Sequence, residues 1–134
     1  MHTPYAFVIE LEQPLGPAVE ALRAALAVEQ MGIVSEFDVQ ATLKAKLGVD
    51  GPPHKLLGLC SPKVAQALLA AEPEIGALLP CGCSVAERSP GHTHIALQDP
   101  RMIAAASGAA EVRAACELAR AALRRVTDRL AAQA

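Results

Sequence analysis

The sequence predicts an α+β fold: one mostly antiparallel sheet of about five strands, helices packed on one face, and a long C-terminal helix. Three observations lead to this class. Strand-like apolar runs alternate with segments of helical periodicity along residues 5–71. Two further strand-like runs flank a Pro-Gly turn, so they must pair as an antiparallel hairpin. The connections are too short for the deep layers of a doubly wound fold, and residues 1–134 fit a single domain.

The first half of the chain is predicted to contain three strand–helix pairs. Asp38 and Ser61 are N-cap residue types, Pro62 suits a first helical turn, and Gly48 is a helix stop. Leu22 and its apolar neighbours recur at helical spacing. The predicted elements are a strand over 5–12, a helix over 17–30, a strand over 32–37, a helix over 39–47, a strand over 54–60 and a helix over 62–71.

The second half is predicted to hold a hairpin and two helices. The hairpin turn is Ser89-Pro90-Gly91, and Asp99-Pro100 repeats the cap-plus-proline signature. The strands cover 81–88 and 92–98, and the helices cover 100–106 and about 109–132, after a connection that holds a short helical turn. The last helix carries an apolar seam with alternating spacings of four and three: Val112, Cys116, Ala119, Leu123, Val126 and Leu130.

Composition excludes several functional classes. Hydrophobic residues make up 52% of the chain but aromatic residues only 2%, so the core must be aliphatic and stacking platforms for single-stranded nucleic acid are missing. The net charge of −2 gives no case for binding nucleic acid or an anionic membrane. We see no signal peptide and no transmembrane segment, and therefore expect a cytoplasmic protein with four reduced cysteines.

Four phrases occur in an order that is similar to a known family. They are GIVSEFDVQATLKAKLG (32–48), LLGLCSPKVAQALL (56–69), EIGALLPC (74–81) and LQDPRMI (97–103). Together they resemble domain of unknown function family 302, a group of small bacterial and archaeal proteins, over about residues 15–125. The resemblance implies a TATA-binding-protein-like α+β fold, a curved antiparallel sheet crossed by a long helix. It implies no reaction, and a fold alone does not supply one.

The most specific parts of the resemblance are the Glu-hydrophobic-Asp step at 36–38, the Cys-x-Pro step at 60–62 and LLPC at 78–81. The chain departs from the family at 82–83, where a polar and then an aliphatic residue are usual and Gly82 and Cys83 stand instead. The pair of histidines that follows is not expected from the family either. A site built from these extra residues would be particular to this protein.

The candidate metal site consists of Cys81, Cys83, His92 and His94. Residues two apart on a strand share a face, so the thiols form one pair and the imidazoles another. A hairpin loop of even length would place both pairs on one face, where thiolates and imidazoles suit Zn or Cu(I). An odd loop would place them on opposite faces. The alternative is that the thiols are small core side chains and the imidazoles are solvated.

The candidate ligand site consists of Glu36, Cys60 and Cys81, all near strand ends. Cys60 also precedes a predicted helix N-terminus, which would lower the pKa of its thiol. Glu36 would join Cys60 only if the two strand ends gather. The alternative for Glu36 is a structural ion pair with Lys44 or Lys46 of the next helix.

Three functions compete on this reading. The first is a non-enzymatic module that binds a small ligand or a soft metal near its cysteines. The second is a structural or interaction protein that forms a homodimer through its apolar seam and sheet edge. The third is an enzyme that uses a cysteine thiolate, for example in redox chemistry. We place the binding module first and the enzyme last.

Overall fold

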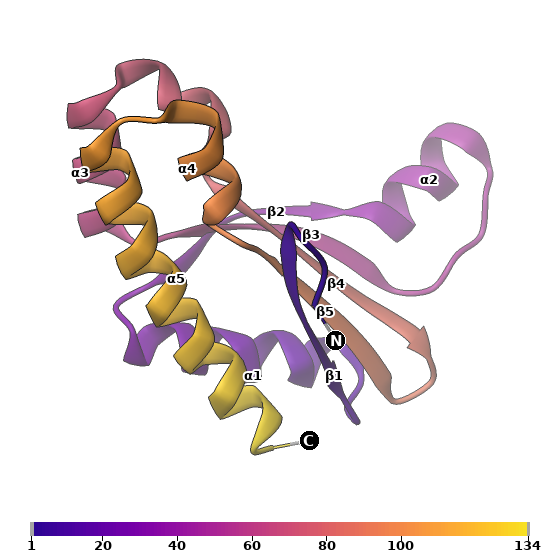
Figure 1. Cartoon of the computed structure of the whole chain (residues 1–134). Helices are drawn as coiled ribbons and strands as arrows, with labels where there is room; N and C mark the ends of the chain where they lie inside the picture. Colours follow the sequence, from indigo (N-terminus) through magenta and orange to yellow (C-terminus); the bar gives the residue numbers. More distant parts are fainter. Residues whose placement is uncertain (1, 134) are drawn as a thin grey trace.

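The computed structural model describes residues 2–133 (Figure 1). Every predicted element is present, and most boundaries agree to within two residues with those predicted from local signals. The elements are β1 (Ala6–Leu11), α1 (Leu15–Val28), β2 (Gly32–Asp38), α2 (Val39–Leu47), β3 (His54–Cys60), α3 (Pro62–Ala71), the 3₁₀ helix η1 (Pro73–Leu78), β4 (Cys81–Ser89), β5 (His92–Gln98), α4 (Arg101–Ser107) and α5 (Ala110–Ala131).

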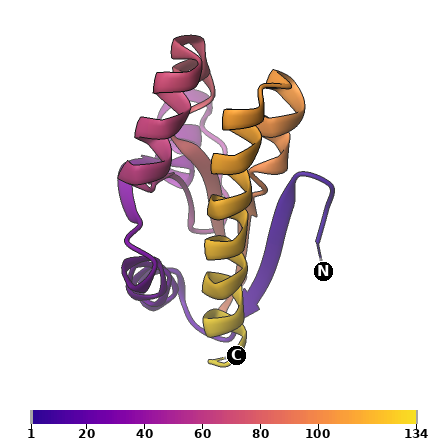
Figure 2. The same ribbon diagram turned by 60° about the vertical axis from the view of Figure 1, so that its left-hand side comes forward.

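The five strands form one antiparallel sheet in the order β1-β5-β4-β3-β2. Helices α1 and α5 cover one face of it, and α3, η1 and α4 gather at the end where β3 and β5 finish (Figures 1 and 2). The predicted α+β class is therefore confirmed, including the long C-terminal helix. Helix α2 lies apart from the other helices, at the far end of β2 and β3 (Figure 1).

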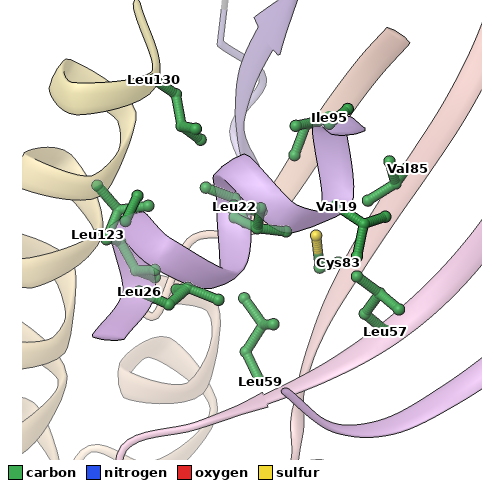
Figure 3. Packing of buried hydrophobic residues seen from close by; sticks show 14 of the residues in the cluster. Val19, Leu22, Leu26, Leu57, Leu59, Cys83, Val85, Ile95, Leu123 and Leu130 are labelled. Carbon is green, nitrogen blue, oxygen red and sulfur yellow. The ribbon is translucent and has the colours of Figure 1, made fainter. Parts of the chain in front are cut away.

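The main core lies between the sheet and helices α1 and α5. Leu22 and Leu26 of α1 are fully buried between Leu123 of α5 and strand residues such as Leu59 and Ile95 (Figure 3). All six residues of the predicted α5 seam are buried, because spacings of four and three keep them on one helical stripe. No helix within residues 2–133 is both long and apolar enough to cross a membrane.

A second, smaller core fills the end of the sheet. Leu68 of α3, Ile75 of η1, Ile103 of α4 and Val112 of α5 are buried there, together with Cys116. Leu79 and Cys81 pack against this cluster from the start of β4. The start of β4 and the end of β3 therefore lie between two separate apolar clusters.

The helix-end signals work as predicted in α2 and only in part in α3. The Asp38 carboxylate accepts a hydrogen bond of 2.9 Å from the Ala41 N–H, and Gly48 ends α2 with a left-handed φ of +67°. Ser61 occupies the N-cap position of α3, but its side chain makes no capping bond to any described residue. Pro62 follows it in the first turn.

Candidate functional site

The β4–β5 register separates the two halves of the predicted metal site. Cys83 pairs with Leu97, Val85 pairs with Ile95, and His94 falls opposite Ala86. Cys83 therefore shares the helix-covered face, as does Cys81 two residues before it, whereas His94 points to the open face. The prediction that all four side chains share one face is wrong: the two pairs lie on opposite faces, although the loop itself, residues 90–91, has an even length. A bulge between Glu87 and Ser89 shifts the pairing by one residue.

The imidazoles on the open face find partners of their own. His94 Nδ1 lies 2.6 Å from Glu10 Oε1 on β1, and His54 Nε2 lies 2.8 Å from Ser84 Oγ on β4. His92 is exposed beside the turn. Within residues 2–133 no three His, Cys, Asp or Glu side chains are grouped so that they could hold one metal ion. Cys81, Cys83, His92 and His94 therefore do not form one site.

Cys60 and Cys81 do come together at the end of the sheet. Leu59 pairs with Cys81 across β3 and β4, so the next residue, Cys60, lies beside the start of β4. Burial raises the pKa of the Cys81 thiol to about 11, with further increases from the nearby Cys116 and Cys60. Burial alone raises the pKa of Cys83 to about 12. Cys81 and Cys83 are thus neutral thiols at physiological pH.

A cavity of about 40 Å³ lies where Cys60 and Cys81 meet. It opens between the end of the sheet and helices α3 and α5, and apolar atoms supply nearly all of its wall. This volume would hold about three water-sized groups. Its walls include Leu59, Cys60, Val64, Leu79, Cys81 and Leu123.

Gln98, at the end of β5, is also part of the cavity wall. Its Oε1 atom is buried and finds no hydrogen-bond partner among residues 2–133. A buried acceptor without a partner is costly and uncommon in folded proteins. The wall of the cavity is therefore nearly all apolar, and the buried Oε1 acceptor of Gln98 is not used by any described residue.

Glu36 lies away from this cavity. Strands β2 and β3 are neighbours but antiparallel, so Gly32 is opposite Cys60 and Glu36 is opposite Leu57, nearer the other end of the sheet. The Glu36 carboxylate is 3.0 Å from Lys55 Nζ on β3. The predicted gathering of Glu36 with Cys60 is wrong for this reason. Its ion-pair alternative holds with Lys55 rather than with Lys44, which pairs with Asp50.

Sequence reasoning missed two buried or bridging carboxylates. Asp99 is 1% exposed and binds Arg101 and Arg120, which ties the end of β5 to α5. Glu87 on β4 accepts hydrogen bonds from the N–H groups of Leu15 (2.8 Å) and Gly91 (3.1 Å), and so supports both the start of α1 and the hairpin turn. The Asp99-Pro100 step signals a cap, but no local signal predicts partners far along the chain.

Comparison with known proteins was consistent on fold and silent on activity. The profile of a family described as domain of unknown function DUF302 matches residues 7–130. A crystal structure of an uncharacterised conserved DUF302 protein from Bacillus stearothermophilus superposes with a TM-score of 0.84 and 23% sequence identity, covering 96% of this chain and 99% of the other. At that identity the likeness concerns the fold alone. No curated protein gives a significant match.

Proposed function

Because this chain belongs to the DUF302 family, whose description assigns no activity, we propose a function from its own geometry. The chain is a non-enzymatic module that binds a small, uncharged, largely apolar ligand. The ligand occupies the cavity beside Cys60 and Cys81. The observation that carries this proposal is an apolar cavity with two thiols and a buried, unused acceptor on Gln98 in its wall. A few polar groups in an otherwise apolar pocket are the usual composition of a small-molecule site.

The position of the cavity supports binding more than it supports catalysis. The cavity lies between the two apolar clusters, and each cluster would hold its walls in place without a ligand. A pKa of about 11 keeps the Cys81 thiol protonated, whereas reactive cysteines have lowered pKa values. This weighs against the thiolate enzyme that the sequence left open.

The test is a titration of the ¹⁵N-labelled chain with xenon and with ethanol, probes small enough for a cavity of about 40 Å³, followed through amide chemical shifts. We expect shifts that saturate and that centre on the ends of β3, β4 and β5. Ala65, on the cavity wall, offers a variant that fills the space, Ala65→Leu, and the exposed Ala70 of the same helix gives the matched control Ala70→Leu. Ala65→Leu should abolish the shifts and Ala70→Leu should retain them. Equal shifts in both variants would place any binding elsewhere.

A second candidate is uptake of a soft metal by the same thiols. It is supported by Cys60 and Cys81, which both line the cavity, although no third metal-ligating side chain within residues 2–133 joins them. Thiolates select Cu(I), and zinc is the other candidate. Native mass spectrometry with Cu(I) and with zinc should give one metal per chain, lost in Cys81→Ser and retained in Cys83→Ser. No metal at any concentration would exclude this candidate.

The setting that we propose for this module is the cytoplasm. All four cysteines are free thiols. Free thiols suit a reducing compartment. Mass spectrometry of alkylated protein taken directly from cells would show four reduced cysteines if this holds.

A further inference from the structure

Helix α2 and strand β2 form an arm that lacks cover. None of the nine residues Val39–Leu47 is buried. Isolated helices shorter than about 12–15 residues are marginal in water, so an uncovered helix of this length gains little from its own backbone. The arm also holds four of the twelve exposed large hydrophobic side chains of the described chain, Val34, Phe37, Leu43 and Leu47, and two more lie next to it, Val49 in the following loop and Leu56 on β3.

Strand β2 is also a bare edge of the sheet. It pairs with β3 on one side, and no strand within residues 2–133 pairs with its other side. Its sequence, GIVSEFD, contains neither lysine nor proline, and its protecting features are limited to the bulge between Ile33 and Ser35 and the charges of Glu36 and Asp38 near its end. On the opposite edge of the sheet, the Val8 N–H of β1 is bonded to His2 Nδ1. The β2 edge is therefore a template for another strand.

A groove lies at the other end of β2. It runs between the C-terminal end of α1, the N-terminal end of α3 and the outer side of α5, and its volume is about 1080 Å³. Val28 and Leu118 stand on its walls with 61% and 70% of their surfaces exposed. Alanines of α3 and α5 line it as well, namely Ala67, Ala114, Ala115, Ala119 and Ala122. Small side chains of this kind allow another helix to approach closely.

Strand β2 links helix α2 to the groove, because α2 lies at one end of this strand and the groove lies at the other. Helix α2 begins directly after the last residue of β2, Asp38. The groove borders the first residue of β2, Gly32, because Met31 precedes it and Ser61 follows its partner Cys60. When two β2 strands pair antiparallel about a twofold axis, the end of each strand lies beside the start of the other. Each α2 is then carried toward the groove of the other copy.

We propose that the chain forms a twofold homodimer in which the β2 edges pair and helix α2 of each copy docks in the α1–α3–α5 groove of the other. The interface is isologous and closes on itself, so it gives dimers rather than filaments. The partner is a second copy because the helix and the groove lie at opposite ends of the same edge strand.

Size and charge agree with this occupant. A nine-residue helix is about 13.5 Å long and about 10–12 Å across, so its volume of about 1,000–1,500 Å³ is of the same order as that of the groove. Lys46 of α2 and Glu111 of the groove have opposite charges, and neither forms an ion pair within residues 2–133. If the two β2 strands of the dimer pair with Ser35 opposite Ser35, Glu36 of each copy lies opposite Val34 of the other. The two Glu36 carboxylates then do not face each other.

The test is sedimentation velocity over a micromolar concentration series. Leu47 is 68% exposed on α2 and Leu118 is on the groove wall, so Leu47→Glu and Leu118→Glu should each weaken dimerisation about thirtyfold or more. Met102, 45% exposed on α4 and outside both surfaces, gives the matched control Met102→Glu, which should dimerise like the wild type. Circular dichroism should show that all three variants are folded.

Mixing the two variants tests the reciprocal arrangement. Leu47→Glu keeps an intact groove and Leu118→Glu keeps an intact α2, so a mixed dimer has one intact helix–groove contact and each homodimer has none. We expect the mixture to dimerise more tightly than either variant alone. A monomeric wild type, a Leu118→Glu chain that dimerises like Met102→Glu, or a mixture no tighter than its components would each overturn the proposal.

Discussion

Removing the carboxylate of Asp99 should break the ion pair that joins the end of β5 to Arg120 of α5, and so lower the free energy of unfolding. The Asp99 side chain is 2% exposed and accepts hydrogen bonds from the Arg101 N–H (2.9 Å), Arg101 Nε (3.0 Å) and Arg120 Nε (3.1 Å). Breaking a buried ion pair from one side costs about 3–5 kcal/mol. Arg120 is 23% exposed and lies over the Phe7 ring, so water and the ring partly compensate its charge. We therefore expect Asp99→Ala to cost about 3 kcal/mol, the lower end of that range.

The same carboxylate makes part of the stability depend on pH. Burial raises the pKa of Asp99, but hydrogen bonds from the Arg101 N–H and from Arg120 outweigh it and hold the pKa below its usual 3.8. A carboxyl whose pKa is lower in the folded state than in the unfolded state stabilises the fold. This contribution is fully present above the pKa of the unfolded state and is lost as pH falls through the pKa of the folded state. The stability gap between wild type and Asp99→Asn, which has no carboxyl to titrate, should therefore narrow below about pH 4.

Urea unfolding followed by circular dichroism measures both effects. Arg101→Ala is the control, because its side chain is 59% exposed and an exposed ion pair contributes less than about 1 kcal/mol. The prediction is refuted if Asp99→Ala lowers the free energy of unfolding at neutral pH by no more than Arg101→Ala does. It also fails if the gap between wild type and Asp99→Asn is the same at acid and neutral pH.

Three further predictions rest on single positions. A Cβ added at Gly58 would lie 2.5 Å from Pro80 Cγ, so Gly58→Ala should lower the free energy of unfolding in urea by about 1–3 kcal/mol. Gly82, on the neighbouring strand β4, has open space around it, so Gly82→Ala should change the free energy of unfolding by less than about 0.5 kcal/mol. Equal changes in the two variants would contradict this prediction. Iodoacetamide should alkylate Cys81 slowly at neutral pH, and the rate measured by peptide mapping should rise about tenfold per pH unit up to the Cys81 pKa of about 11. An alkylation rate equal to that of free cysteine at pH 7 would refute this prediction. Hydrogen bonds from two backbone N–H groups lower the pKa of Glu87, so Glu87→Gln should reduce the melting temperature at neutral pH. The difference in melting temperature between wild type and Glu87→Gln should disappear as pH falls through the lowered pKa. A difference that is the same at every pH would show that the Glu87 carboxylate does not stabilise these two N–H groups by its charge.

The sequence alone determined the elements and the class of fold, because those signals are local. The Asp38 cap and the Gly48 stop act within one helical turn, and both ends of α2 are where they were predicted. The α5 seam depends only on spacing along one helix, and all of it is buried. An aliphatic core followed from a composition with 2% aromatic residues. The antiparallel hairpin followed from a short turn between two strands.

Only the tertiary structure decided what the chemistry-bearing residues do. One bulge in the hairpin reverses the face of His94 relative to Cys83, since strand side chains alternate with a period of two. The antiparallel β2–β3 pairing separates Glu36 from Cys60, whereas the β3–β4 pairing brings Cys60 beside Cys81. Such neighbours depend on the order and direction of strands far apart in the chain. A single residue of register changes them without changing any local signal that the sequence carries.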